Sequence, residues 1–189
     1  MRPIAKQQLN EKLFNAVVRA KTNDVRALIR KGADVNSLDT WDLTALHHAC
    51  RKGHPDIVRL LLEAGADPNR RRDEDPQGET PLDIVCTSNF VPGISSLLLS
   101  HGADVNVKDP LREETLLHNA CREGLTEVVR FLLAHGADVH CQDKFGNTPL
   151  DIAMEVSVSN PARETILDLF REYVPDLVLE KFCTAGPGQ

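Results

Sequence analysis

The sequence predicts an all-α protein made of repeated helix–loop–helix units, and three observations lead to this fold class. A Gly-Ala-Asp motif recurs at spacings of 33, 37 and 34 residues, beginning at Gly32, Gly65, Gly102 and Gly136. A threonine motif recurs between these at spacings of 36, 35 and 33 residues, beginning at Thr44, Thr80, Thr115 and Thr148. The 189 residues include only 6 Phe, 1 Trp and 1 Tyr, which is few for a β-sandwich or a barrel. Two independent motifs in one register indicate a repeat array.

Each threonine motif is expected to begin the first helix of a repeat, because a threonine hydroxyl can cap exposed backbone N–H groups. Proline follows the threonine in two repeats and is favourable in a first helical turn. In the second repeat, apolar or small residues recur at three- and four-residue steps from Leu46 to Gly53, which predicts one buried helical face. A second apolar helix follows from Ile57 to Leu62, and Gly65 is expected to end it in the left-handed conformation. The polar segment after it predicts a turn into the next repeat.

This arrangement resembles the ankyrin repeat, which has a 33-residue period and a Thr-Pro-Leu-His-x-Ala signature. The resemblance rests on Thr44-Ala45-Leu46-His47, Thr80-Pro81-Leu82-Asp83 and their counterparts, and it implies a solenoid of stacked helix pairs with β-hairpin-like fingers. We expect a repeat domain over residues 1–175, with repeats at approximately 9–38, 39–71, 72–108, 109–142 and 143–173. Residues 176–189 are expected to form a C-terminal cap segment and a flexible tail. The first repeat keeps only its helix pair, as is typical of a terminal repeat.

The third repeat departs from the pattern and is predicted to be the softest part of the array. Its finger spans 11 residues from Asn69 to Thr80, against 8 or 9 in the others, and carries a charged insertion. Its second helix contains Pro92-Gly93 and Ser95-Ser96, and Gly and Ser are weak helix formers.

Composition and charge exclude several function classes. With 28 acidic and 22 basic residues the net charge is −6, which argues against general nucleic-acid binding. The N-terminal segment lacks the apolar core of a signal peptide, and no apolar run approaches the length of a membrane span. The 5 cysteines are widely spaced and form no C-x-x-C pair, which is typical of free thiols in a reducing compartment. We therefore expect a cytoplasmic protein, with the nucleus as a second location, rather than a secreted or membrane protein.

Titratable residues within the motifs are interpreted as structural, and no catalytic residue, cofactor or metal ion is predicted. His47, Asp83, His118 and Asp151 occupy one position of the threonine motif, where such a side chain ties one turn to the next. Cys50, Cys86 and Cys121 also share a repeat position and are expected to be buried small apolar side chains, leaving Cys141 and Cys183 as candidates for exposure. The segment from Asp73 to Gly78 imitates the start of a calcium loop, but Ile84 stands where the closing glutamate is needed.

The predicted function is protein–protein interaction. The resemblance implies that fingers and first helices form an extended concave surface, through which a monomeric scaffold or regulator binds a protein or peptide partner. Residues at the variable positions of that surface are the predicted contacts: Thr40, Trp41, Leu43, His48, Arg51 and Lys52; Gln77, Glu79, Thr87 and Ser88; Leu111, Arg112, Glu114, Asn119, Arg122 and Glu123; Lys144, Phe145, Asn147 and Glu155. Trp41 and Phe145 are expected at finger tips, and exposed Trp is favoured in binding hot spots.

Two alternatives stay open beside partner binding. In the resembling family, asparagines of the Gly-Ala-Asp turn can be hydroxylated; Asn36, Asn69 and Asn106 match that pattern, and His140 takes the same place in the fourth turn. A structural role is the competing interpretation, because an Asn side chain can hold such a turn. The second alternative is an enzyme whose catalytic residues are scattered along the chain.

Overall fold

The computed structural model describes residues 3–72, 78–88, 90–157 and 160–177, and the chain divides into two compact bodies. The N-terminal body comprises Met1–Asp104 and the C-terminal body Val105–Gln189. Among the described residues every named element is an α-helix, as predicted. No helix in this part of the chain combines the length and the apolar character that crossing a membrane requires.

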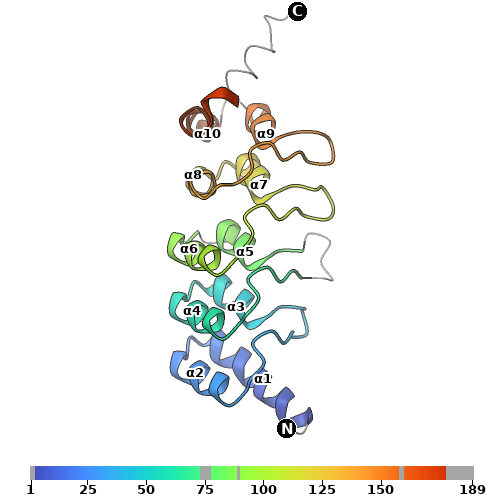
Figure 1. The fold of residues 1–189 in the computed structure, drawn as a ribbon, viewed down its shortest axis with the longest axis vertical. Coiled ribbons are helices and arrows are strands. Elements are labelled where there is room, and N and C mark those ends of the chain that lie inside the picture. The colour runs from blue at the N-terminus through green and yellow to red at the C-terminus, as the bar shows by residue number, and fades with distance from the viewer. Residues whose placement is uncertain (1–2, 73–77, 89, 158–159, 178–189) are drawn as a thin grey trace, which may run out of the picture. The chain divides into compact units, whose positions relative to one another are not determined.

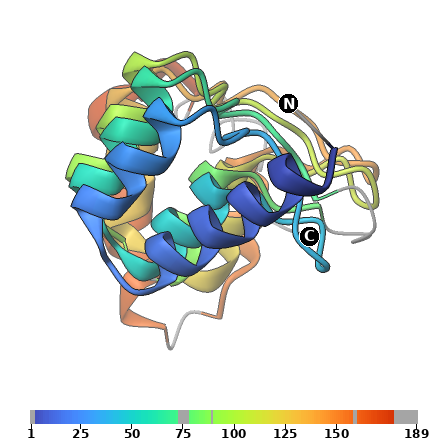
Figure 2. The same cartoon turned by 90° about the horizontal axis from the view of Figure 1, so that it is seen from below.

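The N-terminal body consists of three helix pairs in two layers. One layer holds the first helices, α1 (Pro3–Val18), α3 (Ala45–Lys52) and α5 (Pro81–Ser88). The other holds the second helices, α2 (Thr22–Arg30), α4 (Pro55–Glu63) and α6 (Pro92–Ser100) (Figure 1). Aliphatic residues fill the space between the layers, and Leu46, Ile57, Leu61, Ile84 and Leu98 are fully buried. Figure 2 shows that the fingers of this body extend from the first-helix layer, away from the second helices.

The C-terminal body repeats this arrangement with two helix pairs. Its first helices, α7 (Leu116–Glu123) and α9 (Pro149–Glu155), pack on each other, as do its second helices, α8 (Thr126–Ala134) and α10 (Pro161–Tyr173). Leu117, Leu132, Leu150 and Phe170 form its buried centre. Helical residues also occur over 175–177, where a capping segment was expected, and the predicted tail lies outside the described residues.

Each threonine motif starts a helix through a reciprocal capping box. The backbone N–H of Thr44 donates to His47 Nδ1 at 3.1 Å, and the backbone N–H of His47 donates to Thr44 Oγ1 at 3.4 Å. The Thr80–Asp83 pair makes the same exchange at 2.8 and 3.2 Å. Thr115–His118 and Thr148–Asp151 form the other two boxes. These two histidines and two aspartates are therefore structural, as interpreted, although the boxes cap a helix start; the expected tie to the next turn is seen at His118, whose Nε2 lies 3.1 Å from the Asn147 carbonyl.

The asparagine of the Gly-Ala-Asp turn joins that turn to the next one along the chain. Asn36 Nδ2 donates to the Gly65 carbonyl at 2.9 Å, and Asn36 Oδ1 accepts the N–H of Asp67 at 2.8 Å. Asn69 makes the equivalent bonds to Gly102 and Asp104, both at 2.7 Å. These bonds give the asparagines a structural role, since each asparagine holds two neighbouring turns together. The hydroxylation of these asparagines stays a prediction.

The repeat-position cysteines are buried free thiols, as expected. Cys50, Cys86 and Cys121 are each at most 3% exposed. Burial raises the pKa of the Cys86 thiol to about 12 and raises that of the other two further, so all three stay protonated at neutral pH. Cys141 is only partly exposed, and its Sγ lies 3.3 Å from Asp138 Oδ2. Cys183 lies outside the described residues.

Candidate functional site

An aspartate organises the tip of each fully described finger. Asp39 Oδ1 accepts the N–H groups of Trp41 and Leu43 at 2.8 and 3.0 Å. In a second finger, Asp143 Oδ1 accepts the N–H groups of Phe145 and Asn147 at 2.9 and 2.8 Å. The carbonyls of Leu43 and Asn147 in turn accept the N–H groups of Asp39 and Asp143, which closes each tip like a small hairpin.

The third such finger, in which Asp109 holds the tip, has the same arrangement of hydrogen bonds, but its turn is one residue longer. Asp109 Oδ1 accepts the N–H groups of Leu111 and Arg112 at 2.9 and 2.8 Å, and Asp109 Oδ2 accepts that of Glu114 at 2.9 Å. A single antiparallel bridge between Lys108 and Thr115 is the only β-pairing among the described residues. The hairpin character expected of the fingers is therefore carried by turns rather than by strands.

The bonds that Asp39 and Asp143 accept favour the ionised form of these two carboxyl groups. Burial opposes ionisation of Asp39, but hydrogen bonds from His48 and from the backbone of Leu43 and Trp41 hold the pKa of Asp39 below its usual value. The pKa of Asp143 is lowered in the same way, against its burial, by bonds from Asn147 and Phe145. Sequence analysis missed these aspartates, although each stands five or six residues before a threonine motif.

The fixed turns expose one large apolar side chain two residues after each aspartate. Trp41 is 65% exposed, Leu111 is 49% exposed and Phe145 is 70% exposed. The predicted exposure of Trp41 and Phe145 is thus confirmed. We call Trp41, Leu111 and Phe145 the finger-tip residues; the first lies in the N-terminal body and the other two in the C-terminal body.

In the N-terminal body, the finger that carries Trp41 is braced from several sides. His48 Nε2 of α3 lies 2.7 Å from Asp39 Oδ2, and the ring of Phe14 meets the His48 ring edge-on with centroids 6.1 Å apart. Arg72 Nε donates to the Trp41 carbonyl at 3.1 Å. The Trp41 backbone is therefore held from both its own helix and the next finger.

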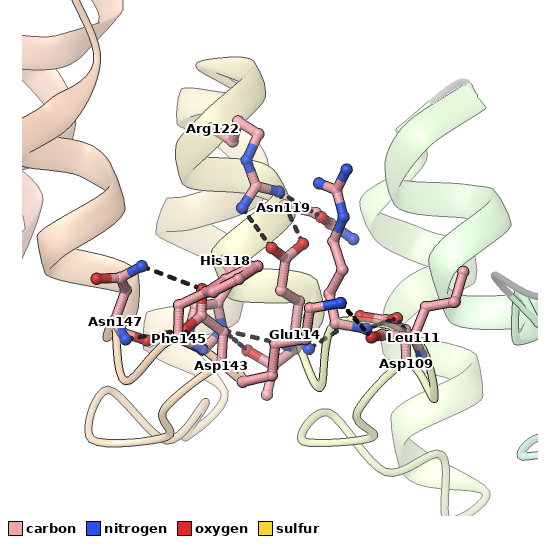
Figure 3. A network of polar contacts seen from close by, with 12 residues as sticks. Asp109, Leu111, Glu114, His118, Asn119, Arg122, Asp143, Phe145 and Asn147 are labelled. Carbon is pink, nitrogen blue, oxygen red and sulfur yellow. Dashed lines mark hydrogen bonds and ion pairs between the residues drawn. The ribbon is translucent and has the colours of Figure 1, made fainter.

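In the C-terminal body, Glu114 and Arg122 form a two-bond ion pair on the face of α7 (Figure 3). Arg122 Nη1 and Nη2 donate to the two carboxylate oxygens at 2.7 and 2.5 Å, and Nη1 also donates to Asn119 Oδ1 at 3.1 Å. Hydrogen bonding to Glu114 raises the pKa of Arg122 above its already high value. The guanidinium is thus fixed beside the finger while about a third of its side chain stays exposed.

The two fingers of this body are joined to each other. The backbone N–H of Lys144 donates to the Arg112 carbonyl at 2.9 Å, and Lys144 Nζ donates to the Leu111 carbonyl at 2.8 Å. The same ammonium lies 5.2 Å from the centroid of the Phe145 ring. Lys144 therefore couples the finger that carries Leu111 to the one that carries Phe145, and leaves both apolar side chains facing solvent.

The prediction that Leu43 and Glu114 contact a partner is wrong, because both side chains are buried. Leu43 is 4% exposed, since it packs into the core at the start of α3, and Glu114 is 4% exposed beneath Arg122. Leu38, which was not among the predicted contacts, is 39% exposed in the finger of Trp41. Gln77 lies outside the described residues. Of the remaining predicted contacts, the exposed ones are Thr40, Arg51, Lys52, Thr87, Ser88, Arg112, Glu123, Lys144 and Glu155 and the partly exposed ones are His48, Glu79, Asn119, Arg122 and Asn147.

The buried histidines are poor candidates for chemistry. Burial lowers the pKa of His47 to about 4, against the opposing effect of backbone groups of Glu79 and Arg70, so the ring is neutral at physiological pH. Burial also lowers the pKa of His118, whose Nε2 lies 3.1 Å from the Asn147 carbonyl. In the part of the chain that the structure describes, no group of three or more His, Cys, Asp or Glu residues is arranged to hold a metal ion.

Comparison with known proteins gives two matching family models and a set of similar proteins. The model described as "Ankyrin repeats (3 copies)" matches residues 13–109, and that described as "Ankyrin repeats (many copies)" matches residues 97–153. Cyclin-dependent kinase 4 inhibitor B of Bos taurus is 35% identical over 118 residues, which are 62% of this chain and 86% of that protein.

Two other relatives are much longer than the segment that they share with this chain. Tyrosine-protein kinase HTK16 of Hydra vulgaris is 31% identical over 171 residues, 89% of this chain but 22% of the kinase. Ankyrin repeat and SOCS box protein 16 of Homo sapiens is 40% identical over 138 residues, 73% of this chain and 29% of that protein. The chain thus spans less than a third of these two relatives and most of the inhibitor.

Proposed function

Because the chain belongs to the ankyrin repeat family, whose repeats mediate protein–protein interaction, we propose that it binds a protein partner through its finger tips and the adjoining first helices, and regulates that partner. The observation that supports this most strongly is the common placement of the finger-tip residues. Trp41, Leu111 and Phe145 are exposed at equivalent positions, although each could have been polar without loss to the core. Exposed apolar side chains on ordered backbone are typical of binding hot spots.

The fixed turns matter for affinity because association must offset the loss of conformational freedom at the interface. Each finger-tip backbone is already held by its aspartate, so little ordering is left for the binding step. Burying roughly 100 Å² of apolar surface on one ring contributes about 2.5 kcal/mol, at about 25 cal/mol per Å². Truncation of one ring to alanine is therefore expected to weaken binding by about tenfold or more.

The charges around the finger-tip residues favour a mixed polar and apolar partner surface. In the C-terminal body, Lys144 Nζ lies 5.2 Å from the centroid of the Phe145 ring, the exposed Arg112 follows Leu111 in the chain, and Arg122 exposes about a third of its side chain. In the N-terminal body, Arg51 and the exposed Lys52 lie on α3, where Arg51 Nη2 is 3.9 Å from Glu79 Oε2. Apolar anchors inside a rim of charges are the usual composition of a protein interface.

A relative that this chain covers over most of its length suggests the class of partner. That protein is named as an inhibitor of cyclin-dependent kinase 4, and 86% of it aligns with this chain. The proposal therefore takes a cyclin-dependent kinase as the first partner to test and regulation by binding, without catalysis by this chain, as the mode of action. It places the monomeric protein in the cytoplasm or the nucleus, because free buried thiols are typical of reducing compartments.

The test is a titration of cyclin-dependent kinase 4 with the full chain and three variants. Trp41→Ala and Phe145→Ala are each expected to weaken binding by at least tenfold and up to about seventyfold, the factor that corresponds to 2.5 kcal/mol. Tyr173→Ala is the matched control, because this aromatic side chain is 38% exposed on α10, away from the fingers. Circular dichroism confirms that each variant is folded. Absence of kinase binding would overturn the partner class, whereas kinase binding that both finger-tip variants leave unchanged would overturn the proposed surface.

A further inference from the structure

Positive charge is concentrated at the start of this acidic chain. The first 31 residues contain 8 of the 22 Lys and Arg residues but only 2 of the 28 Asp and Glu residues. The described part of this segment, residues 3–31, comprises α1, the loop after it, α2 and Lys31, and the two helices make the face of the N-terminal body nearest the viewer in Figure 2. A strongly basic face on a protein of net charge −6 calls for a specific explanation.

An open groove of about 300 Å³ lies between α1 and α2 on this face. Its floor includes the buried Ala16 and the half-buried Leu28. Its rim carries four cationic side chains, all exposed: Lys12, Arg19, Lys21 and Lys31. A second hollow of about 400 Å³ follows the loop from Ala20 to Asp24 and shares Lys21 and Asp24 with the groove. We refer to the first of these as the α1–α2 groove.

The cations of the groove are largely uncompensated. Asp24 is the one acidic residue that lines it, and it pairs with Lys21 at a long 4.0 Å. Lys12, Arg19 and Lys31 make no ion pair with any other residue in the described part of the chain. By contrast, the neighbouring Lys6 forms an ion pair with Asp34 at 3.1 Å, which shows that a lysine of this helix pairs with a carboxylate when one lies within reach. Three like charges held around one groove repel each other and are relieved by an anionic ligand.

We propose that the α1–α2 groove binds a short acidic peptide segment of a protein partner. The apolar floor at Ala16 and Leu28 suits the methylene groups of glutamate side chains, and the cationic rim suits their carboxylates. A nucleic acid fits less well. Residues 32–189 carry 26 acidic against 14 basic side chains, so a polyanion that extends past the groove meets net negative charge. A segment of a few residues neutralises the groove without reaching that region.

This site is separate from the proposed finger-tip surface. None of the residues that line the groove belongs to a finger, and the finger-tip residues do not line it. A partner that carries both an apolar surface for the fingers and an acidic segment for the groove would be held at two places, which raises affinity through the effective concentration of the second contact. The acidic peptide segment binds to the groove without any contact at the finger tips, so the test does not require the identity of the partner that binds there.

The experiment measures fluorescence anisotropy of a labelled peptide of alternating glutamate and alanine added to the full chain. A peptide with glutamine in place of glutamate, and an oligothymidylate of similar length, are the comparison probes. The charge-reversal variant Arg19→Glu/Lys31→Glu changes two rim residues. Arg26→Glu/Arg30→Glu makes the same change in net charge on exposed residues of α2 that do not line the groove, and is the matched control.

The glutamate peptide is expected to bind the unmodified chain, and binding should weaken as salt screens the charges. The rim variant should weaken it by about tenfold or more, and the control variant by no more than about threefold. Trp41→Ala should leave it unchanged, which separates this site from the proposed function. The proposal is overturned if the glutamate peptide does not bind, if the oligothymidylate or the glutamine peptide binds as tightly, or if both charge-reversal variants lose affinity equally. Thermal melts establish that each variant is folded.

Discussion

Removing the carboxylate of Asp143 should loosen the finger that presents Phe145 and destabilise the C-terminal body. Asp143 is 5% exposed, and its Oδ1 accepts two backbone N–H bonds, from Phe145 and Asn147, at 2.9 and 2.8 Å. A hydrogen bond to a charged group contributes about 1.5–3 kcal/mol when its loss leaves a buried partner unsatisfied. Because Phe145 is 70% exposed, water can reach its N–H after the substitution, so the lower part of that range applies. The substitution removes both bonds, at about 1.5 kcal/mol each, so we expect Asp143→Ala to lower the free energy of unfolding by about 3 kcal/mol.

Asp143→Asn provides the matched comparison. Its Oδ1 can still accept both N–H bonds, although without the negative charge, so the expected loss is about 1 kcal/mol. The assay is urea unfolding followed by circular dichroism, combined with amide hydrogen exchange at Phe145 and Asn147, because repeat proteins can unfold in parts. Exchange at these two amides should accelerate in the alanine variant and much less in the asparagine variant. An alanine variant within about 0.5 kcal/mol of the unmodified protein, or an asparagine variant equally destabilised, would refute this account of the finger.

Three further predictions follow from buried groups. Burial lowers the pKa of His47 from 6.5 to about 4, so the folded state disfavours protonation of this ring. The free energy of unfolding should therefore fall by up to about 3 kcal/mol as the pH falls from about 6.5 towards 4. Denaturant midpoints measured across that pH range should show this loss, and the substitution His47→Asp should remove it. Glu114→Gln should cost about 1–2 kcal/mol, less than a fully buried pair because Arg122 is partly exposed, and a double-mutant cycle with Arg122→Ala should show clear non-additivity in thermal melts. A thiol reagent should modify Cys141 well before the buried Cys50, as measured by mass spectrometry of peptides, and equal rates would contradict the burial.

The helices could be predicted from the sequence because their signals are local. A threonine and the residue three positions later form a closed capping box, so the helix start needs no information from distant parts of the chain. The glycine of each Gly-Ala-Asp motif adopts the expected left-handed conformation, with φ of 85° at Gly65 and 78° at Gly136. The burial of Cys50 is also predicted locally, because this residue lies on the helical face marked by apolar residues at three- and four-residue steps.

The finger-tip exposure was predicted from the register, but the details of the surface were not. Trp41 is exposed as expected, whereas Leu43, two residues later, is buried, because Asp42 between them adopts a left-handed conformation, with φ of 56°, that turns the chain back towards the core. The ion pair of Glu114 with Arg122 joins a finger to a helix across eight residues, and no local pattern distinguishes it from two exposed charges. Such pairings depend on the packed arrangement and become visible only in three dimensions.

The α1–α2 groove was also absent from the sequence-based expectations. The net charge of the whole chain is negative, which conceals the local excess of lysine and arginine in the first helix pair. Sequence alone could have shown that excess if the charge had been counted by helix pair. It could not have shown that Lys12, Arg19 and Lys31 converge on one groove, because Lys12 lies on α1, Arg19 and Lys31 directly follow α1 and α2, and their approach depends on how the two helices pack.

Amide hydrogen exchange of the full chain, with and without its bound partner, tests the central claim most directly. The claim predicts slower exchange on binding at Trp41, Leu111 and Phe145 and at the adjoining starts of α3, α7 and α9, with unchanged exchange in α4 and α8. Protection confined to the second helices, with the finger tips exchanging as in the free protein, would contradict it.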